Sequence, residues 1–206
     1  MAGTRLGVDL GGTNVRAALV DPESGALQAP RREAVADRSP QAVVELVARV
    51  AAGAAGPGGP RAHGCVGVGV AGQVLGASGV VLNAPNLGWR DVPFGQMLEG
   101  RLGVPVRVVN DLSAAAWGEF RHGAARGARH ALVVFVGTGV GAGLVLDGRL
   151  HEGAHGVAGE LGHVKVRPPR PGEPPRRCGC GAVGCLEAYA GGANLAARVR
   201  ADLAAG

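Results

Sequence analysis

The chain has 206 residues, of which 47% are hydrophobic and only 3% aromatic, and its formal net charge is +5. This length suits one large or two small domains and is enough for a buried core. The arginines are scattered except for a cluster within the Pro-rich stretch 167–177, and no aromatic residues are interleaved with them. The charge therefore predicts a solvated loop there, and no nucleic-acid partner.

Cysteine usage and apolar runs bear on the compartment. Of the four cysteines, Cys65 stands apart from the other three. This does not suit an extracellular disulfide framework, and the N-terminus lacks the layout of a signal peptide, so a cytoplasmic protein is expected. The uncharged run at residues 64–82 is long enough to raise the question of a membrane span. Its glycines, with Gln73 and Ser78, favour two buried strands joined by a turn, so we expect no membrane partner.

Apolar periodicity and turn residues predict the elements of the first half of the chain. Ser39 followed by Pro40 marks a helix start, with serine as the N-cap and proline at the first helical position. In chain order we expect strands at 4–10, 15–20 and 26–35, a helix at 40–52, a surface loop at 54–60, strands at 64–70, 79–82 and 104–109, and a helix from Asp111 to about Phe120.

A second unit is predicted to begin near residue 130. Strands are expected at 131–136, 140–146 and 149–151, so the strand–turn–strand pattern of the N-terminus occurs twice. This favours an α/β protein with two subdomains, which we place at residues 1–112 and 113–206. The second unit has few further strands or helices and is expected to be incomplete. In a final helix from about Asn194 to Ala204, three apolar residues share one face: Leu195, Val199 and Leu203.

The first glycine turn follows a strand and precedes Arg16. Glycine lets a backbone approach phosphate closely, and Asp9 at the strand end could hold Mg²⁺ directly or through water. Thr13 adds a hydroxyl donor, but no Walker lysine follows, and a plain hairpin turn is the alternative. The residues of this candidate phosphate loop are Asp9, Gly11, Gly12, Thr13 and Asn14.

The second glycine turn is Gly137-Thr138-Gly139. A dinucleotide fingerprint must open a helix, whereas residues 140–146 alternate and return as a strand. NAD and FAD are therefore rejected.

One polar position could face a substrate. Asp111 stands where a strand ends and a helix begins, which is where open α/β sheets place ligands, although aspartate is also a preferred N-cap. Asn86, in the stretch 84–89, is by itself typical of a Pro-Asn turn.

The stretch from Gly159 to Glu187 has the strongest chemical signal. Cys178, Cys180 and Cys185 fall within eight residues, and with His163 upstream they could close a tetrahedral zinc site of the structural type. The alternative is a glycine-rich turn with free or paired cysteines, but adjacent Cys-x-Cys thiols are hard to bridge to each other. Glu160 and Glu187 flank the cluster, so a metal there would hold the two acids at one place.

These motifs resemble those of the ROK family of sugar kinases, bacterial glucokinases above all. The family pattern Gly-Glu-x-Gly-His, then Cys-x-Cys-Gly-x-x-Gly-Cys-x-Glu, occurs at 159–187, Asp-x-Gly-Gly-Thr-x-x-Arg at 9–16, and Asn-Asp at 110–111. The resemblance runs from Leu6 to about Gly192. One departure is Ala71-Gly72-Gln73-Val74, where the family usually has Pro-Gly-Pro-Val, so this loop lacks two prolines that restrict the backbone.

The resemblance implies an actin/hexokinase-like (ribonuclease H-like) duplicated fold and the ATP-dependent phosphorylation of a hexose, above all glucose to glucose 6-phosphate. It implies ATP, Mg²⁺ and structural Zn²⁺ as cofactors, with Asp111 as the general base. It assigns phosphate contacts to both glycine turns, and zinc binding to His163, Cys178, Cys180 and Cys185. His163 would then use one ring nitrogen for zinc and the other for sugar. The implied sugar contacts are Gly72, Asn86, Asn110, Asp111, Glu160, His163 and Glu187.

Two other interpretations are open. Family members continue beyond the position of Gly206, so the chain could be a truncated, weakly active or inactive member that binds sugar and zinc, with sugar held better than ATP. A sugar-responsive repressor of the same family would need an N-terminal helix-turn-helix, whereas the chain opens on a strand, so this is disfavoured. We also expect a homo-oligomer, a dimer, that covers part of the final helix.

Overall fold

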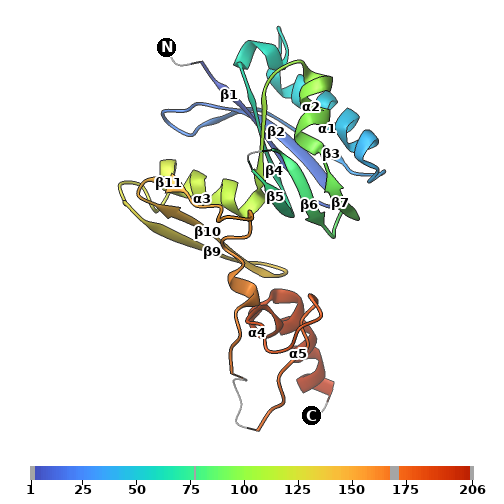
Figure 1. Ribbon diagram of the computed structural model, residues 1–206, viewed down its shortest axis with the longest axis vertical. Coiled ribbons are helices and arrows are strands. Elements are labelled where there is room, and N and C mark those ends of the chain that lie inside the picture. The colour runs from blue at the N-terminus through green and yellow to red at the C-terminus, as the bar shows by residue number, and fades with distance from the viewer. Residues whose placement is uncertain (1–2, 77, 168–171, 205–206) are drawn as a thin grey trace.

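The computed structural model describes residues 3–76, 78–167 and 172–204. A larger β-sheet unit and a smaller one meet at helix α3 (Asp111–His122), and the C-terminal part extends beyond the smaller sheet (Figure 1).

The larger sheet has the strand order β3-β2-β1-β4-β8. β2 runs antiparallel to β1 and β3, whereas β4 runs parallel to both β1 and β8. Leu10 pairs with Val70, and Val70 pairs with Asn110, so the carboxyl ends of three parallel strands meet at one edge. The bounds are β1 (Arg5–Leu10), β2 (Asn14–Val20), β3 (Leu27–Ala34), β4 (Val66–Val70) and β8 (Val106–Asn110).

Two helices, α1 (Pro40–Ala55) and α2 (Phe94–Leu102), pack against this sheet and against each other. Val43, Val47 and Val50 of α1 recur at helical spacing and are almost fully buried in the main core. Beside them lie a short 3₁₀ helix, Pro60–His63, and a small antiparallel sheet of β5 (Gln73–Leu75), β6 (Val80–Ala84) and β7 (Trp89–Val92).

The smaller sheet has the order β11-β10-β9, with all pairs antiparallel: β9 (Ala131–Val136), β10 (Val140–Leu146) and β11 (Arg149–Leu150). Helix α3 packs on β10, where a side chain at Gly143 would overlap Ala116. Beyond the sheet come a 3₁₀ turn at Leu161–His163, α4 (Glu187–Ala190) and α5 (Gly192–Ala204). Both units thus open on a three-stranded antiparallel meander, as the repeated pattern predicts.

Several predicted boundaries were wrong. Helix α1 continues through Ala55, into the predicted loop, because Ala54 and Ala55 are buried. Ser39 occupies the N-cap position, but its side chain makes no capping hydrogen bond. The run at 64–82 contributes three strands instead of two, and its turn joins β5 to β6. In the described part of the chain, no helix has the length and apolarity that crossing a membrane requires.

The prediction also missed α2 and β7. Phe94, Leu98 and Leu102 are buried at positions i, i+4 and i+8, which is a helical signal. Gly95 and Gly100 interrupt it, since glycine disfavours helix interiors by about 1 kcal/mol relative to alanine.

Candidate functional site

The carboxyl edge of the larger sheet places Asn110 and Asp111 at the start of α3. Asn110 is the N-cap, because its Oδ1 accepts the N–H of Ser113 at 3.0 Å. The capping role considered for Asp111 therefore belongs to its neighbour. The Oδ1 of Asp111 accepts the N–H of Leu112 at 2.9 Å and one side-chain N–H of Asn110 at 3.1 Å.

The pKa of Asp111 lies above the ordinary aspartate value. Burial is the main cause, because it disfavours the charged form, and the negative charge of Asp9 adds to it. The hydrogen bonds from Leu112 and Asn110 act in the opposite direction. Because Leu10 pairs with Val70 and Val70 pairs with Asn110, Asp9 and Asp111 both lie at the carboxyl edge of the larger sheet.

The loops after β4 and β6 close this edge. The side chain of Asn110 donates to the carbonyl oxygen of Gly72 at 3.0 Å. A Cβ at Gly72 would lie 2.6 Å from the carbonyl oxygen of Asn83, and one at Gly12 would lie 2.7 Å from the Cβ of Asn86. Both glycines thus permit close packing of the backbone, which brings Gly12 against Asn86, while Gly72 is hydrogen-bonded to Asn110.

The first glycine turn is a tight hairpin. The N–H of Gly11 donates to the carbonyl oxygen of Asn14 at 3.0 Å, and the N–H of Val35 donates to that of Thr13 at 2.8 Å. Asp9 pairs with Arg16 at 3.1 Å, and both side chains are more than half exposed. Such a pair contributes about 0–1 kcal/mol, so the Asp9 carboxylate is available to a cation at little cost.

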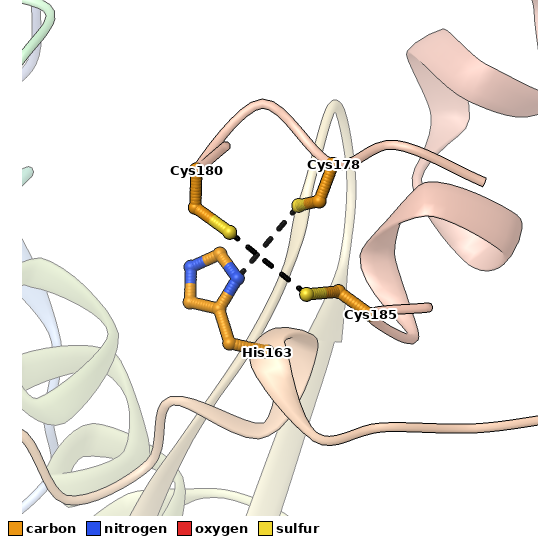
Figure 2. A group of neighbouring side chains, drawn as sticks. All are labelled: His163, Cys178, Cys180 and Cys185. Atoms are coloured by element: carbon orange, nitrogen blue, oxygen red, sulfur yellow. Dashed lines mark hydrogen bonds between the residues drawn. The ribbon is translucent and has the colours of Figure 1, made fainter. Parts of the chain in front are cut away.

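His163, Cys178, Cys180 and Cys185 form a cluster that suits a metal ion (Figure 2). Their ligand atoms all lie within 4.8 Å of one another. The sulfurs of Cys180 and Cys185 are 3.8 Å apart, and the sulfur of Cys178 is 3.9 Å from Nδ1 of His163. With Zn–S bonds of about 2.3 Å, a tetrahedral site separates two sulfurs by about 3.8 Å, so the cluster fits zinc.

The charges around the cluster also suit a cation. Burial raises the pKa of Cys178 to about 11, so this thiol keeps its proton unless a metal displaces it. The N–H of Ala182 is the main cause that lowers the pKa of Cys180. Lys165 donates to the sulfur of Cys185 at 3.1 Å and to the carbonyl oxygen of Val183 at 2.8 Å. The prediction missed this lysine, although its place two residues after His163 was a signal.

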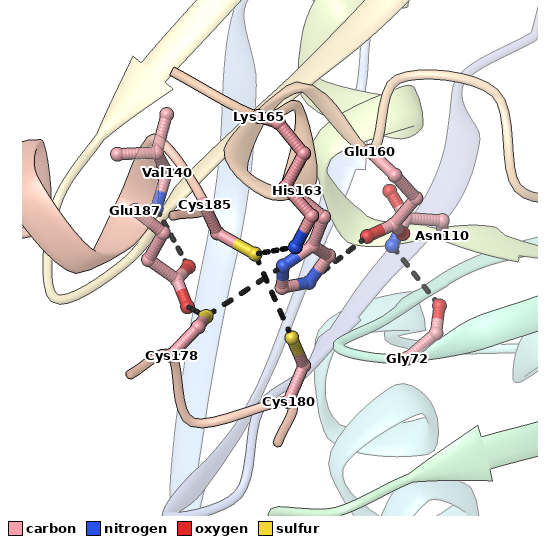
Figure 3. Close-up of polar contacts among 10 residues, drawn as sticks. All are labelled: Gly72, Asn110, Val140, Glu160, His163, Lys165, Cys178, Cys180, Cys185 and Glu187. Atoms are coloured by element: carbon pink, nitrogen blue, oxygen red, sulfur yellow. Dashed lines mark hydrogen bonds and ion pairs between the residues drawn. The ribbon is translucent and has the colours of Figure 1, made fainter. Parts of the chain in front are cut away.

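The two acids that flank the cluster differ in their contacts (Figure 3). Oε2 of Glu160 lies 3.6 Å from Nε2 of His163, whose other nitrogen faces the sulfurs. Oε1 of Glu187 is 3.8 Å from the sulfur of Cys178, and its Oε2 accepts the N–H of Val140 at 3.0 Å. Both acids border the cluster, but Glu187 also contacts the second glycine turn.

That second turn joins two antiparallel strands. The N–H of Gly137 donates to the carbonyl oxygen of Gly139 at 2.9 Å, and residues 140–146 form β10. The return of the chain as a strand confirms the reason given for rejecting a dinucleotide fingerprint.

Comparisons with known proteins agree with this architecture. The ROK family model matches residues 5–205. Glucokinase from Streptomyces coelicolor is 38% identical over 195 residues, which cover 94% of this chain and 58% of the glucokinase. N-acetylmannosamine kinase from Salmonella typhimurium is 38% identical over 202 residues, covering 98% of this chain and 66% of the kinase. The chain thus spans less than two thirds of these relatives.

Solved structures give the same fold. A ROK family glucokinase from Streptomyces griseus, in complex with glucose and AMPPNP, has a TM-score of 0.81 and 38% identity over 98% of this chain and 62% of its own. A ROK family transcriptional regulator, a homolog of the E. coli MLC protein, has a TM-score of 0.80 and 26% identity over 100% of this chain and 51% of its own. The fold class is confirmed, but since kinases and a regulator share it, the site must decide the function.

Proposed function

Because the chain belongs to the ROK family, we propose that it carries the substrate site of an ATP-dependent hexose kinase, with glucose as the first candidate sugar. The observation that carries the proposal is Asp111. Its half-buried carboxylate has a raised pKa and lies at the sheet edge that Asp9 also faces. A base of raised pKa next to a phosphate loop suits phosphoryl transfer.

In this proposal Asp111 accepts the proton of the attacking sugar hydroxyl. The hydroxyl oxygen forms a bond to the γ-phosphorus, the bond from that phosphorus to the bridging oxygen breaks, and ADP leaves. Asn110 orients the base, because its amide donates to Asp111 and also fixes the carbonyl of Gly72. The sugar would lie among Asn86, Asn110, Glu160 and His163, and Glu187 would complete the set of acids. The two glycine turns would hold the phosphates through backbone N–H groups.

Two metals belong to the proposal. Mg²⁺ would be held at Asp9, where it would neutralise charge on the phosphates. Zinc would be held by His163, Cys178, Cys180 and Cys185 and would have a structural role, because four protein ligands leave no open position. Metal analysis of protein purified without added zinc should give one zinc per chain. A stoichiometry near zero with intact sugar affinity would contradict this role.

A coupled kinase assay over a sugar panel, with ATP and Mg²⁺, tests the function. The panel must include N-acetylmannosamine, because the Salmonella kinase and the Streptomyces glucokinase are each 38% identical to this chain. We expect phosphorylation of glucose, with light scattering giving the mass of a dimer. Sugar binding by calorimetry without turnover of any sugar would favour the weakly active, sugar-binding alternative.

A further inference from the structure

The second glycine turn rests on the segment that follows the metal cluster. The N–H of Gly192 donates to the carbonyl oxygen of Gly137 at 2.8 Å, and that of Ala193 donates to the carbonyl oxygen of Thr138 at 3.3 Å. The first residues of α5 therefore satisfy two carbonyls of the turn. The fit is close, since a Cβ at Gly192 would lie 2.6 Å from the carbonyl oxygen of Gly137.

Glu187 holds the other side of the turn. Its Oε2 accepts the N–H of Val140, the first residue after the turn, at 3.0 Å (Figure 3). A Cβ at Gly139 would overlap the same carboxylate in its present position, so glycine leaves room for the carboxylate beside Val140. A hydrogen bond to a charged acceptor is about twice as strong as a neutral one, so Glu187 is a substantial restraint on the turn.

The same residue is fixed to the metal cluster. Glu187 follows the ligand Cys185 by two residues, in a turn where the N–H of Ala188 donates to the carbonyl oxygen of Cys185 at 3.0 Å. The side chain of Asn194 donates to the carbonyl oxygen of Glu187 at 3.0 Å. An ion that pins Cys178 and Cys185 therefore also fixes the position from which the Glu187 carboxylate reaches Val140.

We propose that Glu187 is a positioning residue for the second glycine turn, through which metal occupancy is coupled to binding of the phosphates of a nucleoside triphosphate. The phosphate half of this inference rests on the proposed function of the turn. The coupling is reciprocal: if zinc tightens phosphate binding by some factor, phosphate tightens zinc binding by the same factor.

Amide hydrogen exchange at Val140, measured by NMR with and without a zinc chelator, tests the positioning. In Glu187→Ala the amide loses its acceptor, and we expect its exchange to become about tenfold faster or more. Glu187→Gln keeps an acceptor oxygen and should preserve most of the protection. The matched control is Glu160→Ala, measured at saturating zinc, which removes the acid that contacts His163 and should leave Val140 exchange unchanged while the metal site is filled.

Zinc chelation in both proteins shows whether the metal acts on Val140 through Glu187 or by another route. Zinc removal should speed exchange at Val140 in the wild type and add little in Glu187→Ala, because the link is already absent. Equal effects of chelation in both proteins, or normal Val140 exchange in Glu187→Ala, would overturn the proposal. If Glu187 serves only as a sugar contact, its substitution weakens glucose binding and leaves Val140 protected.

Titration with AMPPNP tests the phosphate half. We expect affinity to fall about tenfold in Glu187→Ala and in zinc-free wild type, and much less in Glu187→Gln. If the exchange results hold but the wild type does not bind AMPPNP, the proposed nucleotide function fails and the positioning of the turn by Glu187 stands.

Discussion

The two glycine turns are held by different physical means. The turn at Gly11–Asn14 continues two strands of the main core, and Asn86 packs directly against Gly12. The turn at Gly137–Gly139 lies at the end of a three-stranded sheet and is held by polar contacts from the segment after the metal ligands. The buried strands on either side therefore position the first turn. In our proposal the second turn depends instead on the metal cluster, whose thiolates need a cation to lie side by side.

The largest expected effect is on kcat, and it comes from the proposed base, which lies outside both turns. Asp111→Asn should lower kcat about 10²–10⁴-fold, because the amide cannot accept the proton. Sugar binding should persist, since the amide keeps the shape and still forms hydrogen bonds. A coupled assay and calorimetric titration of glucose measure the two effects. Asp37→Asn, at an exposed turn, is the control and should keep its rate. The parental rate in Asp111→Asn would show that this residue is not the base.

The next largest effect is on the free energy of unfolding, and it tests how much the buried core of the first unit contributes to stability. The side chain of Phe94 is fully buried, with its ring 4.9 Å from that of Trp89. Phe94→Ala should reduce the free energy of unfolding by about 3–5 kcal/mol, because it leaves a cavity in the main core. Urea unfolding measures the change. The control is Leu195→Ala in α5, where the leucine is 45% exposed and the loss should stay within about 0.5 kcal/mol. Equal losses would remove the contrast between the two regions.

A pair of glycine substitutions compares the turns directly. Gly12→Ala should destabilise by about 1–3 kcal/mol, because the new methyl group would lie 2.7 Å from the Cβ of Asn86. Gly137→Ala should change stability by less than about 0.5 kcal/mol, since a Cβ there has no atom within 4 Å. Thermal unfolding of both variants gives the comparison. A larger loss of stability in Gly137→Ala than in Gly12→Ala would contradict the proposed difference between the two turns.

The smallest expected effect is in the pH dependence of kcat. Below its pKa the Asp111 carboxyl holds a proton and cannot act as a base, so kcat should fall as pH decreases. Because burial raises the pKa of Asp111, the midpoint should lie above the ordinary aspartate value of about 4. A raised pKa in the folded state also means that stability is lost as pH rises through it, so Asp111→Asn should not be less stable at neutral pH. A kcat profile with its midpoint at or below 4 would contradict this.

Sequence periodicity predicted the elements whose apolar spacing is continuous, such as β1 and α1, and failed where glycine interrupts it, as in α2. Motif spacing predicted the metal cluster, because its ligands are close in the chain. The contact between Glu187 and Val140 spans 47 residues of sequence and depends on how α4 meets the second sheet, which local patterns do not encode. Local patterns also could not tell that Asn110, and not Asp111, is the N-cap of α3, because asparagine and aspartate are equally preferred at that position.

The position of Lys165 has a practical consequence. It is the only lysine among the 206 residues, so apart from an α-amine the chain has one primary amine, and this lies 3.1 Å from the sulfur of Cys185. An amine-reactive fluorophore would therefore attach beside the metal cluster without an engineered labelling site. We expect its emission to report the loading and loss of the ion in the native sequence. Acylation of the same nitrogen would remove the ammonium group that donates to the Cys185 sulfur.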